Sequence, residues 1–242
     1  MSAYGSMAPF YDALTSDVPY EDFLALYEAE FSRRGLCASS VLDLACGTGT
    51  MTCLLSKRGY DTIGVDLSSE MLSMSREKAE ELDLPNTPLF LCQDITRLDL
   101  YGTVDAAVCC LDGLNYISQD KLPLVFGRLR LFIRPGGVLI FDLLSPERLK
   151  ALDGSLFADE AEDVLCLWRG VFNSGNSSLS YDVDLFIRQG SLWRRETEEH
   201  VEYARETETV LELLDKSGFA DARVIDGPES DQGRVFFSAV RR

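Results

Sequence analysis

The sequence has few of the residues that build metal sites and disulfide frameworks. Its 242 residues include one histidine, His200, and seven cysteines, an odd number without any Cys-x-x-Cys pair. Several cysteines lie in apolar runs such as Val104 to Leu111. There, cysteine serves as a small buried hydrophobe, as it does in proteins of a reducing compartment. We therefore expect no bound metal, no disulfide framework and a cytoplasmic protein.

Long apolar runs and positive charge are also scarce. No uninterrupted apolar run approaches the roughly 18 residues that span a membrane, and the first residues lack the basic start and apolar core of a signal peptide. Forty acidic residues against 23 basic ones give a net charge of −17 and a pI near 4.4. This charge repels phosphate backbones and anionic lipid, which disfavours nucleic acid or membrane and favours a small-molecule substrate. The alternative is that the charge only keeps the protein soluble.

Residues 41 to 144 alternate between short apolar runs and amphipathic segments. The apolar runs, each a predicted strand, are 41–45, 62–65, 89–92, 104–111 and 138–143. Helices are predicted over 50–58, from a cap at Ser68 to about Leu82, and from Ser118 through a stripe of Leu122, Val125, Phe126 and Leu129. Strands that are apolar on both faces and alternate with helices indicate an α/β fold with a doubly wound, mostly parallel sheet.

The pattern changes after Ser145-Pro146. Strands are predicted over 164–172, 179–187 and 192–203, the middle one by alternation of apolar and polar residues over 179–185. They suggest a small antiparallel β insert over 145–205. A helix over 207–216, ended by Gly218, and two strands over 221–226 and 233–240 then complete the main sheet. We expect residues 1–144 and 206–242 to form the core, with 1–40 as helices of an N-terminal lid.

The run from Val41 to Thr50, Val-Leu-Asp-Leu-Ala-Cys-Gly-Thr-Gly-Thr, joins a strand to a helix through a tight glycine turn. Such a turn brings bare backbone and helix N–H groups close to a ligand. Asp66 follows Gly49 by 17 residues and ends the next predicted strand, where its carboxylate can accept both hydroxyls of a ribose. Gln93-Asp94 and Leu111-Asp112 close the next two strands, so all these groups are expected at one sheet edge.

Two other nucleotide-binding patterns fit less well. A dinucleotide fingerprint needs Gly-x-Gly-x-x-Gly, but its third glycine position is occupied here by Thr52. A phosphate-binding P-loop needs Gly-Lys-Ser/Thr, which is absent from the turn. The sequence therefore favours a cofactor that has ribose and adenine but no pyrophosphate.

These motifs resemble those of class I S-adenosylmethionine-dependent methyltransferases. The resemblance covers about 41 to 144 and includes the run Leu111-Asp112-Gly113-Leu114-Asn115-Tyr116 and Arg134-Pro135-Gly136-Gly137. It implies a Rossmann-like, seven-stranded fold with S-adenosylmethionine as cofactor, and in-line methyl transfer to an N, O or C atom. The tyrosine-rich start and the insert resemble small-molecule enzymes of this family, among them amino-sugar N-methyltransferases.

The resemblance also implies which residues contact the cofactor. Ala45, Gly47 and Gly49 would line its amino-acid half, and Asp66 would hold the ribose hydroxyls. The family often has glycine at Ala45, and we expect alanine to be tolerated there because the backbone keeps a negative φ. The remaining contacts implied are Leu67 and Met71 at the adenine, Asp94 at its amino group with Gln93 and Ile95 beside it, the Leu111 carbonyl near the ammonium group, and Tyr11 over the cofactor.

Tyr11, Tyr116 and His200 are the candidate catalytic residues. The tyrosines can line the methyl-transfer pocket, and so can Tyr4 unless it belongs to a frayed terminus. His200 can steer or deprotonate a substrate if its strand face turns toward the cofactor. The alternative for His200 is a solvated outer face, which it shares with Glu196, Glu198 and Glu202.

Other interpretations of the sequence remain open. Trp168 and Trp193 can form a substrate wall or, as we expect, pack the core of the insert. A non-catalytic S-adenosylmethionine-binding protein would show the same motifs, and an RNA methyltransferase is disfavoured by the charge. The chain is expected to act as a monomer or homodimer.

Overall fold

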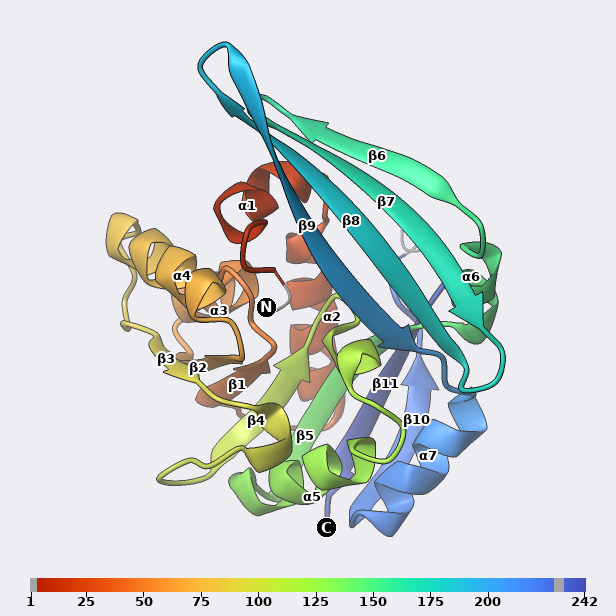
Figure 1. Ribbon diagram of the computed structural model, residues 1–242. Helices are drawn as coiled ribbons and strands as arrows, with labels where there is room; N and C mark the ends of the chain where they lie inside the picture. Colours follow the sequence, from red (N-terminus) through yellow and green to blue (C-terminus); the bar gives the residue numbers. More distant parts are fainter. Residues whose placement is uncertain (1–3, 229–232) are drawn as a thin grey trace.

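The chain forms two β-sheets that pack through the N-terminal segment (Figure 1). The structure, a computed structural model, describes residues 4–228 and 233–242. Within these residues the larger sheet has seven strands: β1 (Ser40–Leu44), β2 (Asp61–Asp66), β3 (Leu89–Cys92), β4 (Val104–Cys109), β5 (Ile133–Leu144), β10 (Phe219–Ile225) and β11 (Arg234–Arg241). Its helices are α2 (Tyr20–Arg33), α3 (Thr50–Lys57), α4 (Ser69–Glu81), α5 (Leu122–Phe132) and α7 (Thr207–Lys216), with 3-10 turns η2 (Ile95–Arg97) and η3 (Gly113–Tyr116).

The strand order of the larger sheet is β10-β11-β5-β4-β1-β2-β3. β11 pairs antiparallel with both of its neighbours, and all other pairs are parallel. The order changes direction at β1, from which the chain winds first toward β3 and then toward β5. The predicted doubly wound, mostly parallel α/β sheet is therefore confirmed.

Helices cover both faces of this sheet because its strands are apolar on both sides. The predicted stripe of α5 is fully buried and packs with α7 against one face. α2 and α3 pack against the other face, where Phe23 and Tyr27 contribute large buried side chains.

The second sheet is antiparallel, with strand order β6-β7-β8-β9. Its strands are β6 (Leu156–Ala161), β7 (Val164–Asn173), β8 (Ser178–Gln189) and β9 (Leu192–Tyr203), and the short helix α6 (Pro146–Ala151) precedes them. The sequence did not predict β6, because this edge strand is exposed on both faces and has no apolar alternation. One face of β8 is buried against Leu149 of α6 and Met7.

The N-terminal segment folds against the inner face of the second sheet. It contains the 3-10 turn η1 (Ala8–Phe10) and the one-turn helix α1 (Tyr11–Leu14). In Figure 1, α1 lies between α4 and the four-stranded sheet. Residues 1–40 were predicted to form helices of a lid. The long helix found there is α2, and η1 and α1 are only short elements before it.

The turn after β1 differs from expectation at Ala45, which has φ +51° rather than a negative φ. Gly47 and Gly49 also have positive φ values, of +53° and +76°. Thr52, which stands where a dinucleotide fingerprint has glycine, donates from Oγ1 to the buried Asp43 carboxylate at 2.6 Å. This bond joins α3 to β1 across the turn.

The loop after β4 also departs from the predicted pattern. The strand was expected to reach Leu111, but it ends at Cys109, and Leu111 and Asp112 have positive φ. The Asp112 N–H donates to the Asp142 carboxylate at 2.8 Å, and Arg234 contacts both carboxylates. With these contacts, the chain leaves the sheet two residues before the predicted end of the strand.

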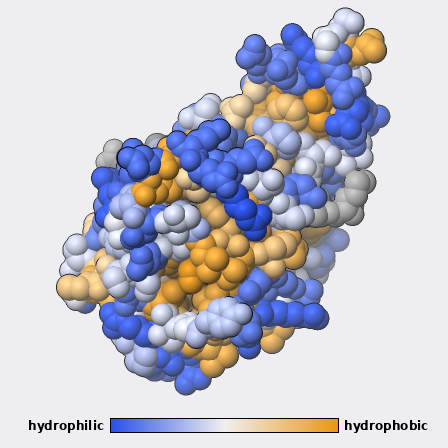
Figure 2. Space-filling view, turned by 90° about the vertical axis from the view of Figure 1, so that its left-hand side faces the viewer, coloured by the Kyte–Doolittle hydropathy of each residue, from blue (hydrophilic) through white to orange (hydrophobic). Residues whose placement is uncertain are grey.

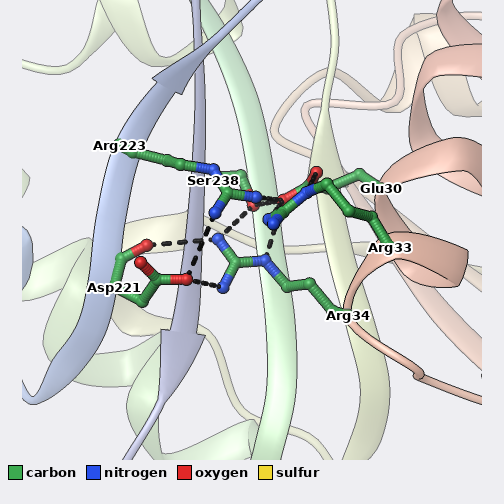
Figure 3. Close-up of polar contacts among 6 residues, drawn as sticks. All are labelled: Glu30, Arg33, Arg34, Asp221, Arg223 and Ser238. Atoms are coloured by element: carbon green, nitrogen blue, oxygen red, sulfur yellow. Dashed lines mark hydrogen bonds and ion pairs between the residues drawn. The ribbon is translucent and has the colours of Figure 1, made fainter.

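A buried carboxylate, Glu30, ties α2 to the β10–β11 hairpin (Figure 3). It pairs with Arg33 and Arg34 of its own helix and with Arg223 of β10, at 2.7 to 2.8 Å, and it accepts from Ser238 of β11. A buried carboxylate keeps its charge when several donors surround it. These hydrogen bonds lower the pKa of Glu30 although its burial acts in the opposite direction.

We expect the Ala45 and Gly49 positions to respond oppositely to substitution. Ala45→Gly should raise the free energy of unfolding by roughly 1 kcal/mol, because glycine adopts positive φ without strain. Gly49→Ala should lower it by about 3 kcal/mol, because its new Cβ would lie 2.7 Å from Cβ of Ser75. Urea unfolding of both variants measures these changes, and two changes of the same sign would contradict the prediction.

Glu30→Gln should destabilise the fold by about 3 kcal/mol, because three arginines would lose their shared buried counter-ion. Glu212→Gln is the matched control: its partner Lys216 and its own side chain are both 68% exposed, so its loss should cost less than about 0.5 kcal/mol. Urea unfolding measures both variants. Equal losses of unfolding free energy in the two variants would show that the Glu30 cluster stabilises the fold no more than a surface salt bridge does.

Candidate active site

A cavity of about 390 Å³ lies at the carboxyl ends of β1, β2, β3 and β4. This is the edge at which open α/β sheets bind ligands, and its size suits a nucleoside-sized molecule. On the face that Figure 2 shows, hydrophobic residues gather in the middle, below the projecting four-stranded sheet, with hydrophilic residues around them. Leu67, which lines the cavity, is 67% exposed.

Asp66 links the first two strand ends of the cavity. Its Oδ2 accepts the Gly47 N–H and its Oδ1 accepts the Ser68 N–H, both at 2.8 Å. Burial raises the pKa of Asp66, and these bonds act against that increase. Each oxygen keeps a lone pair for a further donor, so the carboxylate can accept two more hydrogen bonds, and its role at the ribose hydroxyls stays a prediction.

The next strand end supplies the other polar wall of the cavity. Asp94 accepts hydrogen bonds from the N–H and the hydroxyl of Thr96, at 2.9 and 2.7 Å. Burial raises the pKa of Asp94, but these bonds outweigh it and leave the pKa lowered, so the carboxylate stays an acceptor. Gln93 and Ile95 line the cavity beside it, with Leu67 and Met71 nearby in the lining.

The glycine turn leaves open space where a ligand needs it. A Cβ added at Gly47 would meet no atom within 4 Å, so the backbone there faces free volume. Gly49, in contrast, packs against Ser75 and Phe90 and does not line the cavity. Gly49 thus serves close packing of α3, α4 and β3, and the cofactor contact implied for it stays a prediction.

Most of the predicted site residues line this one cavity: Tyr11, Ala45, Gly47, Asp66, Leu67, Met71, Gln93, Asp94, Ile95, Leu111 and Tyr116. The lining also contains residues that were not predicted: Tyr20, Cys46, Thr48, Thr50, Met51, Ser68, Cys110, Gly113, Ile117 and Val201. Most of these are chain neighbours of predicted residues, which is the signal that could have identified them. Val201 comes from the second sheet, and no motif marks it.

Tyrosines close the end of the cavity that faces the second sheet. Tyr4, Tyr11, Tyr20 and Tyr116 line it, and the hydroxyls of Tyr4 and Tyr116 lie 2.5 Å apart. The rings of Tyr4 and Tyr11 meet edge to face with centroids 5.6 Å apart. Burial raises the pKa of Tyr4, Tyr11 and Tyr116, so their hydroxyls stay protonated. Tyr4 is packed in the site, and the alternative of a frayed terminus is wrong.

His200 lies behind this aromatic wall and does not line the cavity. It is 1% exposed, so the expectation of a solvated outer face is wrong. The face of β9 that carries His200 is turned toward the N-terminal segment, and its ring centroid lies 4.5 Å from that of Tyr4. Its Nε2 lies 3.1 Å from Oε2 of Glu198.

The two tryptophans of the second sheet differ from one another. Trp168 stacks on Phe157 with centroids 5.8 Å apart and packs with the apolar cluster of that sheet, as expected. Trp193 is 48% exposed beneath the guanidinium of Arg188, so the expectation of core packing is wrong for it. Neither residue lines the cavity.

Metal binding and membrane crossing can also be judged over residues 4–228 and 233–242. Across this part of the chain, no cluster of three or more His, Cys, Asp or Glu side chains is arranged to hold a metal ion. Nor do the helices described there include one that is long and apolar enough to cross a membrane.

Comparison with known proteins agrees with this geometry. Residues 41–137 match the family model described as a methyltransferase domain. The chain is 32% identical over 246 residues to the "Putative methyltransferase YqeM" of Bacillus subtilis (strain 168), which covers 98% of this chain and 97% of that protein.

Solved structures extend the likeness to the whole fold. An S-adenosylmethionine-dependent methyltransferase from Clostridium acetobutylicum ATCC 824 is 29% identical, with a TM-score of 0.84 over 99% of both chains. CalS10, an S-adenosylmethionine-bound amino pentose methyltransferase from Micromonospora echinaspora, is 20% identical, with a TM-score of 0.77 over 100% of this chain and 98% of that one. The family match, the relative and the cavity at the sheet edge together show that the chain belongs to the S-adenosylmethionine-dependent methyltransferases.

Proposed function

We propose that this enzyme methylates a small molecule. Residues 1–144 and 206–242 would bind the methyl donor, and residues 145–205 would form the substrate side. The observation that carries the proposal is the cavity itself, which runs from Asp94 to Tyr116 and is bounded by the N-terminal segment and by Val201 of β9. A tyrosine-walled cavity of this size suits a metabolite better than a polymer, and the net charge of −17 disfavours RNA.

S-adenosylmethionine supplies a methyl group that is already activated on a sulfonium. Asp66 would accept the two ribose hydroxyls, and Asp94 would accept from the adenine amino group between Gln93 and Ile95. Ala45, Gly47 and Leu111 would surround the amino-acid half of the donor. Leu67 and Met71 would enclose the adenine. The proposed fit of S-adenosylmethionine to the cavity is supported by the Asp66 carboxylate at the end of β2 and by the free volume at Gly47.

Tyr11 and Tyr116 are the residues we propose to contact the acceptor at the methyl-transfer end. Their buried, protonated hydroxyls can donate hydrogen bonds, and their rings exclude water. In-line transfer then depends mainly on holding the acceptor atom in position. We propose His200, which lies behind Tyr4, as a positioning residue rather than a base in contact with substrate.

The acceptor can be an N, O or C atom, and the similar structure of CalS10 is that of an amino pentose methyltransferase. All seven cysteines are free thiols in the structure, which supports a reducing compartment, and we propose the cytoplasm. The enzyme would act there as a monomer or homodimer.

Incubation with methyl-labelled S-adenosylmethionine and a deproteinised metabolite extract tests the proposed substrate class. We expect label to appear in a small metabolite that fits a ligand pocket of roughly 300 to 1,000 Å³. The control is the same extract with the Asp66→Asn variant. Label found only in added tRNA or added protein would overturn the small-molecule proposal.

Asp66→Asn should weaken binding of S-adenosylhomocysteine by about 10- to 100-fold, because hydrogen bonds to a charged acceptor are lost. Asp61→Asn, at the exposed start of the same strand, should leave the affinity unchanged. Because burial raises the pKa of Asp66, wild-type affinity should also fall on acidification at a higher pH than an exposed aspartate would give. Isothermal titration calorimetry measures all three, and equal affinities of the two variants would contradict the assignment.

A further inference from the structure

We propose that Glu198 is a positioning residue of the methyl-transfer site, whose carboxylate holds residues 4–7 over the donor cavity and thereby fixes Tyr4. The proposal rests on the function of the cavity described above. Glu198 lies on β9 of the second sheet and would act on the reaction through the N-terminal segment. Glu198 itself does not line the cavity.

The Glu198 carboxylate accepts from three backbone N–H groups, those of Tyr4, Ser6 and Met7, and lies beside one imidazole ring. Its Oε1 accepts the N–H groups of Ser6 at 2.6 Å and Met7 at 3.1 Å. Its Oε2 accepts the N–H of Tyr4 at 3.0 Å and lies 3.1 Å from Nε2 of His200. The side chain is 4% exposed, so these contacts replace most of its hydrating water.

The surroundings keep this carboxylate charged. Burial raises the pKa of Glu198, but the contacts with His200 and with the Ser6 and Met7 N–H groups outweigh it, and the pKa is lowered overall. A charged acceptor binds backbone N–H groups about twice as strongly as a neutral one. The segment from Tyr4 to Met7 is therefore held by a single buried charge.

This contact determines where the Tyr4 ring lies. Its centroid is 4.5 Å from that of His200 and 5.8 Å from that of Tyr116, whose hydroxyl meets the Tyr4 hydroxyl at 2.5 Å. Tyr4 also has φ +64°, a backbone conformation that tyrosine rarely adopts without such support. Loss of the Glu198 charge would release the ring from the cavity wall.

The other end of the segment is bound to the core. Asp12 accepts from Oγ1 of Thr48 at 2.6 Å and pairs with Lys78 of α4 at 2.7 Å. Thr48 belongs to the cavity-lining turn, so residues 4–12 bridge the second sheet and the core across the site (Figure 1). Asp12 is 50% exposed and Glu198 is 4% exposed, which makes Glu198 the firmer of the two attachments.

The test is a double-mutant cycle on S-adenosylhomocysteine affinity. Glu198→Gln keeps the shape of the side chain and removes its charge, and Tyr4→Ala removes the side chain that it positions. We expect each variant to raise the Kd by about tenfold and the double variant to raise it no further, because the two residues act as one unit. Glu199→Gln, at the exposed neighbouring position on the opposite face of β9, should leave the Kd unchanged.

Hydrogen exchange of the unliganded protein tests the attachment separately. The amides of Tyr4, Ser6 and Met7 should exchange about tenfold faster in Glu198→Gln than in the wild type or Glu199→Gln. Unchanged exchange, an unchanged Kd, or additive effects of the two substitutions would each overturn the proposal. Should Glu198→Gln not fold, an unchanged Kd in Tyr4→Ala would overturn it as well. Failure of the small-molecule proposal would appear in the metabolite-extract assay and would leave these measurements unaffected.

Discussion

The parallel pairing of β1 between β2 and β4 is the constraint on which the rest of the structure depends. It brings three loops to one edge of the sheet. The bond from the Gly47 N–H to Asp66 then joins two of these loops into one wall. Because every parallel strand ends at this edge, the donor site needs little beyond short loops and a few carboxylates.

Buried carboxylates make the long-range connections that the sheet alone cannot. Glu30 joins α2 to the C-terminal hairpin, and Asp142 holds the loop after β4 through the Asp112 N–H. Glu198 joins the second sheet to a segment 192 residues earlier in the chain. Burying each of these carboxylates costs free energy, and only several well-placed donors offset that cost. Such contacts specify one arrangement of distant segments, whereas apolar packing alone tolerates several.

The donor side of the site could be predicted because its residues follow strand ends. Asp66, Asp94 and Leu111 each come after an apolar run, and the periodicity of helices and strands places such runs reliably. Prediction failed where neighbours distant in the chain decide the outcome. His200 is buried because β9 faces the N-terminal segment, and the positive φ of Ala45 is likewise absent from the sequence pattern. β6 lacks a signal because an edge strand exposed on both faces needs no alternation.

The sequence by itself determined the α/β class and the strand-end carboxylates, because these depend on local period and on spacing within about 70 residues of Val41, and the resemblance of its motifs to a known family implied the methyl donor. Only the tertiary structure decided that the tyrosines at the start of the chain and β9 of the second sheet meet at one end of the cavity. That meeting depends on the Glu198 contacts with residues 4–7. No local pattern encodes them, because a buried carboxylate finds its donors only once both segments have folded.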